Sequence, residues 1–98
     1  MDAAYYDDLA GRLYGLLITL EDRLGSEQTG LLHHFIEVGE YGLALEGIAG
    51  MLAQDAIAIT GLEREKILAL ARHMKMEGGL VTRALGFCPV IRGQPDND

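Results

Sequence analysis

The 98-residue sequence contains few of the residue types that form covalent links, nucleophiles or rigid turns. It has one cysteine, Cys88, so an intramolecular disulfide is impossible, which fits a reducing compartment. Its single serine is Ser26, and tryptophan is absent. Both prolines, Pro89 and Pro95, lie among the last ten residues. The chain before them is therefore free to be helical.

Basic residues are also scarce, with 8 Lys and Arg against 15 Asp and Glu, for a net charge of −7. Nucleic acids and anionic membranes attract clustered Lys and Arg, so this balance argues against both as partners. The sequence opens with Asp2, Asp7 and Asp8 and lacks the basic segment of a secretory signal, and no apolar run is long enough to span a membrane. We expect a cytoplasmic protein, whose charge either steers it toward basic partners or only keeps it soluble.

The composition that remains is that of a globular helical protein, 49% hydrophobic and 23% charged. A chain of this length forms one domain. We predict an all-α fold, a small bundle of four main helices with a tight elbow between the second and third. Residues 1–86 are expected to form the helical domain. Residues 87–98 are expected to be a C-terminal tail that is packed as far as Val90–Ile91 and frayed beyond.

The first three helices are predicted from apolar spacing and from their boundary residues. The first is expected over residues 2–24, ended by Gly25 in a left-handed conformation. Its inner face is a run of leucines at helical spacing: Leu9, Leu13, Leu16, Leu17, Leu20 and Leu24. The second is expected from Glu27 to Val38, capped by Ser26. The third runs from Glu40 to Gln54, directly after the hinge at Gly39.

The second half of the chain contains the clearest helix start. Thr60 followed by Glu63 is a capping box, in which each side chain accepts a hydrogen bond from the other residue's amide. The fourth helix is predicted from Gly61 to about Met76, with Glu63 facing water. Residues 55–61 alternate in apolar character, but a single short strand has no evident partner, so an apolar loop is predicted there. Leu80–Leu85 are expected to form a short helical turn.

No group of residues in the sequence indicates catalysis or a metal. His33 and His34 are adjacent and point about 100° apart on a helix, so they cannot readily face one metal ion. Cys88 precedes a proline in the predicted tail, where no helix begins at it to activate a thiolate. Adjacent acids such as Asp7 and Asp8 are more often solvated helix faces than acid–base pairs. We expect no cofactor, no metal and no enzymatic activity.

Two segments resemble a known family. Residues 35–46 read FIEVGEYGLALE and resemble the E-x-G-E-Y-x-x-A-L-E core of small helical immunity proteins of the MafI-like kind. Residues 58–60 followed by Glu63, together with residues 70–76, are similar to the I-x-I-S/T-x-x-E and M-x-L/M half of the same pattern. The resemblance covers roughly residues 31–80, and it departs from the pattern at Gly61.

The resemblance implies a bacterial immunity protein, a cytoplasmic and non-catalytic antidote that binds the cognate domain of a polymorphic toxin. Many such toxin domains have basic clefts, which an acidic surface would complement. The candidate partner-binding residues are the acids and the tyrosine around the third helix: Glu37, Glu40, Tyr41, Glu46 and Asp55. The alternative is a helical adaptor or a homodimerising domain unrelated to toxins, and a homodimer is compatible with either interpretation.

Overall fold

A computed structural model describes residues 3–91, and within them the fold is the predicted all-α bundle. The helices are α1 (Ala3–Leu20), α2 (Ser26–Glu37), α3 (Tyr41–Gln54), α4 (Gly61–His73) and α5 (Leu80–Leu85), with a 3-10 turn, η1 (Glu21–Arg23), after α1. Two short strands, β1 (Ile59–Thr60) and β2 (Val90–Ile91), complete the described chain.

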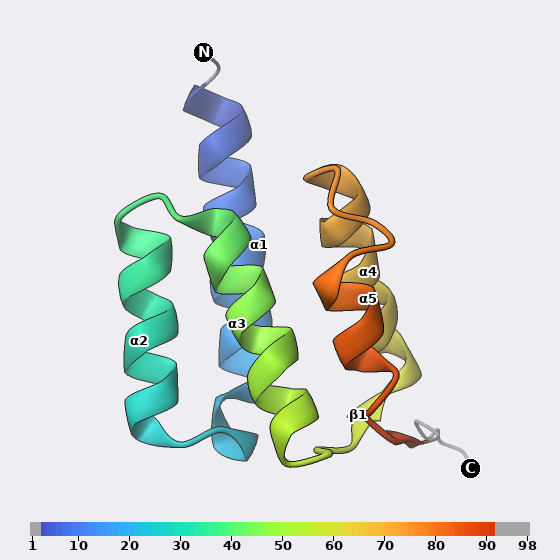
Figure 1. Cartoon of the computed structure of the whole chain (residues 1–98). Coiled ribbons are helices and arrows are strands. Elements are labelled where there is room, and N and C mark those ends of the chain that lie inside the picture. Colours follow the sequence, from blue (N-terminus) through green and yellow to red (C-terminus); the bar gives the residue numbers. More distant parts are fainter. Residues whose placement is uncertain (1–2, 92–98) are drawn as a thin grey trace, which may run out of the picture.

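The helices pack side by side along the long axis of a molecule that measures 44 × 26 × 25 Å (Figure 1). α2 and α3 form an antiparallel pair on one side, α4 and α5 lie on the other, and α1 runs behind α3. α3 contacts each of the other four α-helices. This central helix has an apolar face because Ala44, Leu45, Ile48, Ala49 and Leu52 follow helical spacing, and all five are buried.

The predicted leucine face of α1 is confirmed, but the helix does not extend to Leu24 and end at Gly25 as predicted. All six predicted leucines are buried, including Leu24, which lies beyond the helix. The α-helix ends at Leu20 and tightens into η1. Gly25 has a φ of −71°, which is not left-handed, and it is the N-cap of α2. The predicted cap by Ser26 is wrong, because Ser26 is the first residue of α2 and no side chain of the described residues caps the helix. The Gln28 side chain instead accepts a hydrogen bond from the Gly25 amide at 2.9 Å.

The elbow between α2 and α3 is a glycine-centred helix end. Gly39 has a φ of +81°, a backbone region that costs other residues free energy. The Glu40 amide donates to the Phe35 carbonyl at 2.8 Å and the Gly39 amide donates to the Ile36 carbonyl at 3.1 Å. These two bonds are those of a Schellman motif, which ends one helix and turns the chain at once into the next. The predicted elbow is therefore present.

The prediction of an unpaired loop at residues 55–61 is wrong at its end. Ile59 and Thr60 form β1, which pairs in parallel with β2, with Ile59 opposite Val90 and Thr60 opposite Ile91. The Ile59 amide donates to the Pro89 carbonyl at 2.9 Å. The missing partner strand comes from the predicted tail, 31 positions further along the chain, so nothing local in the sequence indicates it.

The start of the predicted tail is part of the fold. Cys88 is buried, and its sulfur lies 3.9 Å from the Ala84 carbonyl oxygen. Backbone pairing continues through Val90 and Ile91, although both side chains are about half exposed. The predicted fraying concerns residues 92–98, which lie outside the described residues. The helical core thus draws on residues from Leu9 to Cys88.

Candidate functional site

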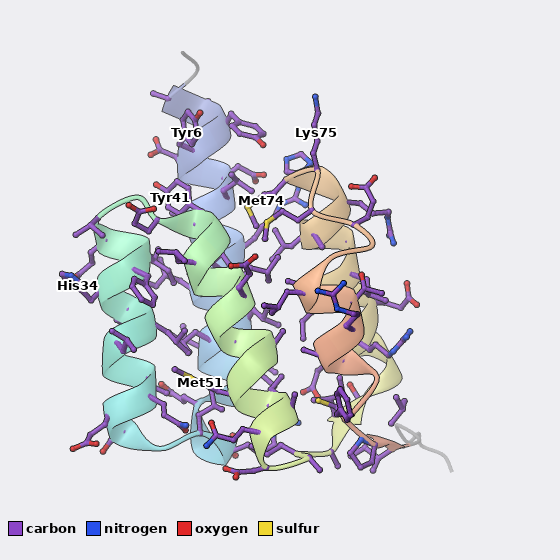
Figure 2. The ribbon with its side chains drawn as sticks, in the orientation of Figure 1. Tyr6, His34, Tyr41, Met51, Met74 and Lys75 are labelled. Carbon is purple, nitrogen blue, oxygen red and sulfur yellow. The ribbon has the colours of Figure 1, made fainter. Side chains whose placement is uncertain are left out.

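A hollow of about 290 Å³ opens at the end of the bundle where α3 begins and α4 ends. Three separate parts of the chain line it: Tyr5, Tyr6 and Leu9 from α1, residues 39–42 from the elbow, and Met74 and Met76 from the segment after α4. Figure 2 shows Tyr6, Tyr41, Met74 and Lys75 gathered at this end of the molecule. We call this site the tyrosine hollow.

The aromatic rings of the hollow contact one another in a chain. Tyr6 and Tyr41 stack with ring centroids 6.0 Å apart and an angle of 25° between the rings. Tyr5 meets the Tyr6 ring edge-on at 5.1 Å, and the His73 ring lies 5.3 Å from Tyr5. The Tyr5 hydroxyl is 3.5 Å from the His73 carbonyl, at the limit of a hydrogen bond. Contacts of this kind hold α1, α3 and the end of α4 together.

Two helix ends shape the hollow. The Schellman motif at Gly39 places Glu40 and Tyr41 at its rim. On the other side, the Met76 amide donates to the Ala71 carbonyl at 2.7 Å and the Lys75 amide donates to the Arg72 carbonyl at 3.0 Å. This is a second Schellman motif, with Lys75 in the left-handed position at a φ of +59°. The turn brings Met76 back over Gly42, where a β-carbon would lie 3.8 Å from the Met76 sulfur.

These residue types suit a protein partner that presents a basic or aromatic side chain. Tyrosine and methionine are enriched at protein interfaces, and methionine adapts its shape to the group it meets. The faces of tyrosine rings attract Lys and Arg through cation–π contact. Glu40 is exposed at the rim, so its carboxylate can pair with the same cation.

The five predicted site residues do not all lie together. Glu40 and Tyr41 line the tyrosine hollow, and exposed Glu37 is in the last turn of α2 just before the elbow. Glu46 is half-buried, more than one turn further along α3. Asp55 is exposed at the opposite end of α3, roughly 20 Å away along the helix axis. The assignment of these residues to a partner stays a prediction.

Sequence reasoning missed the other half of the hollow. Tyr5 and Tyr6 lie in the first turns of α1, and Met74 and Met76 follow the end of α4. All four are half-buried. The adjacent pair Tyr5 and Tyr6 could have indicated an aromatic side chain near the surface, because two neighbouring residues on a helix cannot both point to the centre of the core. Nothing in the sequence indicated that the end of α4 would lie beside them.

The prediction that Glu63 faces water is wrong. Glu63 is 8% exposed, and its two carboxylate oxygens accept from the Arg23 guanidinium at 2.8 and 2.6 Å. The capping box with Thr60 is present, since the Thr60 amide donates to the Glu63 Oε1 at 2.8 Å and the Glu63 amide donates to the Thr60 hydroxyl at 3.0 Å. The hydrogen bond from Arg23 lowers the pKa of Glu63, and the hydrogen bond to Glu63 raises the pKa of Arg23.

Cys88 and the potential metal ligands are the remaining reactive groups of residues 3–91. Burial raises the pKa of the Cys88 thiol, which favours its protonated form. No group of three or more His, Cys, Asp or Glu side chains within this range is placed to hold a metal ion. No helix in the same range is both long enough and apolar enough to cross a membrane.

A scan against family models, a search of curated proteins and a search of solved structures each find no match for this chain. The resemblance to MafI-like immunity proteins therefore rests on residues 35–46 and 58–76 alone.

Proposed function

We propose that this chain is an immunity protein that binds and neutralises a polymorphic toxin domain in the bacterial cytoplasm, without catalysis. The observation that carries the proposal is the tyrosine hollow. It combines stacked rings, two methionines and a rim carboxylate at the segment that resembles the MafI-like core. A toxin domain with a basic cleft would place a Lys or Arg side chain in the hollow, against Tyr41 and Glu40.

The proposal predicts that the gene immediately upstream encodes a protein with a toxic C-terminal domain, and co-expressing the chain with that domain tests neutralisation. We expect the chain to restore growth and to form a complex with that domain. Continued killing with the chain present at equal or higher level would contradict the proposal.

The docking face is tested by replacing Glu37, Glu40 and Glu46 together with glutamine. We expect toxin affinity to fall at least about tenfold, or roughly 1.4 kcal/mol, because the carboxylates lose their pairing with basic groups. The matched control replaces three exposed acids elsewhere with glutamine: Glu21, Glu27 and Glu65. Both triple variants change the net charge equally. Equal affinities for the two variants in low-salt titration calorimetry would place docking elsewhere.

The second candidate function is a helical adaptor or a homodimer. Exposed apolar side chains at the end of the molecule away from the tyrosine hollow favour it. Leu62, Phe87 and Val90 are 66%, 71% and 52% exposed, and Ile91 beside them is 48% exposed. They lie around the β1–β2 ladder, which α4 contacts. Apolar side chains gathered on a surface mark association sites. Sedimentation velocity tests self-association at this surface, which a dimer that Phe87→Ser converts to a monomer would support. Because a homodimer is compatible with both candidates, only the failure to neutralise a toxin favours the adaptor.

A further inference from the structure

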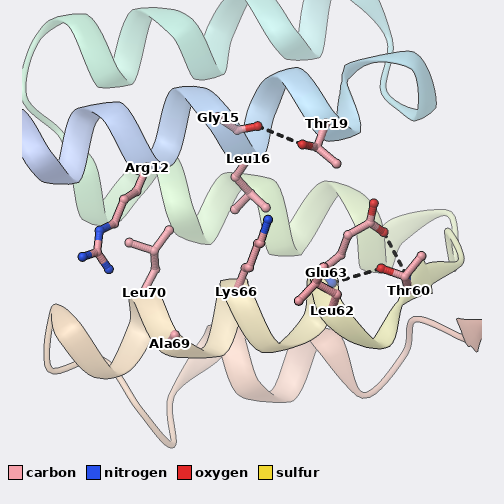
Figure 3. A pocket seen from close by; sticks show the side chains of 10 residues that line it. All are labelled: Arg12, Gly15, Leu16, Thr19, Thr60, Leu62, Glu63, Lys66, Ala69 and Leu70. Carbon is pink, nitrogen blue, oxygen red and sulfur yellow. Dashed lines mark hydrogen bonds between the residues drawn. The ribbon is translucent and has the colours of Figure 1, made fainter. Parts of the chain in front are cut away.

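A second recess, separate from the tyrosine hollow, lies along the groove between α1 and α4 (Figure 3). Its volume is about 510 Å³, within the roughly 300–1,000 Å³ typical of small-molecule sites. Neither the resemblance nor the proposed function assigns a role to this α1–α4 groove.

The groove exists because small residues stand where two helices face each other. Gly15 lies in the α1 wall, and a β-carbon built on it would meet no atom within 4 Å. Ala69 lies in the opposite wall on α4. Leu16 and Leu70 reach into the space between the helices and give the groove an apolar lining (Figure 3).

Two cations reach the groove from opposite walls. Arg12 extends from α1 and Lys66 from α4 (Figure 3). Within residues 3–91 Lys66 has no ion pair, and Arg12 uses only its Nε, which lies 2.9 Å from Asp8. The terminal nitrogens of Arg12 and the ammonium of Lys66 keep their donors for a ligand. Among the described residues Lys66 is therefore the cation of the groove without an ion pair, whereas the charge of Arg12 is partly compensated by Asp8.

The acidic group of the groove does not oppose an anionic ligand. Glu63 lies at one end, but both of its oxygens accept from Arg23 and one also accepts from the Thr60 amide. Its charge is therefore compensated within the fold. The same end carries the hydroxyls of Thr19 and Thr60.

We propose that the α1–α4 groove binds a small amphipathic carboxylate, with the carboxylate between Lys66 and Arg12 and the apolar part against Leu16 and Leu70. Charged hydrogen bonds fix the carboxylate head group, and burial of the ligand's apolar part supplies the remaining affinity. A neutral or cationic molecule of the same length lacks the first contribution. The groove thus discriminates by charge as well as by size.

Octanoate, 1-octanol and octylammonium test this discrimination, since they share one alkyl chain and differ in head-group charge. We titrate each into the full chain and follow backbone amide shifts by NMR. Octanoate is expected to bind saturably with a dissociation constant of about 1 mM or tighter, with shifts at Gly15, Lys66 and Ala69, and at least about tenfold more tightly than the other two. No saturable shift, or equal binding of all three, would overturn the proposal.

Two variants and one control locate the binding. Gly15→Met fills the groove and should abolish octanoate shifts, whereas Gly11→Met makes the same change in the same helix outside the groove lining. A β-carbon at either glycine meets no atom within 4 Å, so both variants should fold. Lys66→Met keeps the side-chain length and removes the charge, and it should weaken octanoate at least about fivefold while leaving 1-octanol unchanged. Unchanged octanoate binding in both Gly15→Met and Lys66→Met would exclude this groove.

Discussion

The side chain of Arg23 connects four parts of the chain. Its guanidinium donates to the Thr19 and Ala58 carbonyls, each at 3.2 Å, and makes two bonds to Glu63. It thereby links η1, the end of α1, the approach to β1 and the first turn of α4. Buried charges persist in proteins when they are paired and hydrogen-bonded, as here.

Replacing Glu63 with Gln should therefore destabilise the fold by about 2–4 kcal/mol, because Arg23 loses its charged partner while the Thr60 amide keeps an acceptor. The control is Asp8→Asn, which breaks the exposed Arg12–Asp8 pair, with side chains 52% and 50% exposed, and should cost less than about 1 kcal/mol. Urea unfolding measures both. Similar losses for the two variants would contradict the central role of the Arg23–Glu63 pair.

The same pair makes stability depend on pH. Glu63 has a folded-state pKa below the ordinary value of 4.5, so the unfolded chain takes up its proton first as the pH falls. The stabilisation is present in full above the ordinary pKa and is lost as the pH drops through the lowered one. The difference in melting temperature between the wild type and Glu63→Gln should accordingly shrink below about pH 4.5. A difference that stays constant down to pH 2.5 would contradict this pKa shift.

Among the helices, α3 shows how one residue type takes opposite roles. A β-carbon on Gly47 would lie 2.7 Å from the Leu32 Cδ2 of α2, and Leu32 is fully buried. A β-carbon on Gly50 would meet nothing within 4 Å. Gly47 therefore permits the close approach of α2 and α3, whereas Gly50 only weakens its own helix.

Alanine substitutions should consequently differ in sign. Gly50→Ala should raise the free energy of unfolding by about 0.5–1 kcal/mol through helix propensity. Gly47→Ala should lower it by about 1–3 kcal/mol, because Leu32 must leave its packed position. Thermal unfolding of the two variants provides the comparison, and stabilisation by both would mean that α2 and α3 can separate without cost.

At the scale of the whole molecule, the folded unit extends past the last helix. A chain ending at Gly86 lacks buried Cys88 and the β2 strand, whereas a chain ending at Ile91 keeps both. We expect the chain ending at Ile91 to be more stable by at least about 2 kcal/mol. The shorter chain loses a buried side chain and the hydrogen bonds of the β1–β2 ladder. Equal denaturation midpoints would show that residues 87–91 contribute nothing.

The sequence predicts what is local and leaves out what joins distant segments. Apolar spacing predicted the buried leucines of α1, and Gly39 and the Thr60–Glu63 box marked helix boundaries, because each signal spans a few residues. The Arg23–Glu63 pair spans 40 positions and the β1–β2 pairing spans 31. The tyrosine hollow likewise needs three separate segments. Such contacts follow from how the helices pack, which periodicity does not specify.

The parallel ladder between β1 and β2 also bears on the order of events in time. It closes a loop that contains α4 and α5, so it can form only after that whole segment has been synthesised and brought back to Ile59. Contacts between α1, α2 and α3 join successive helices and should form sooner, because short loops close at lower entropic cost. In pulsed hydrogen exchange during refolding, the Ile59 amide, bonded to the Pro89 carbonyl, should gain protection later than the amides of α3.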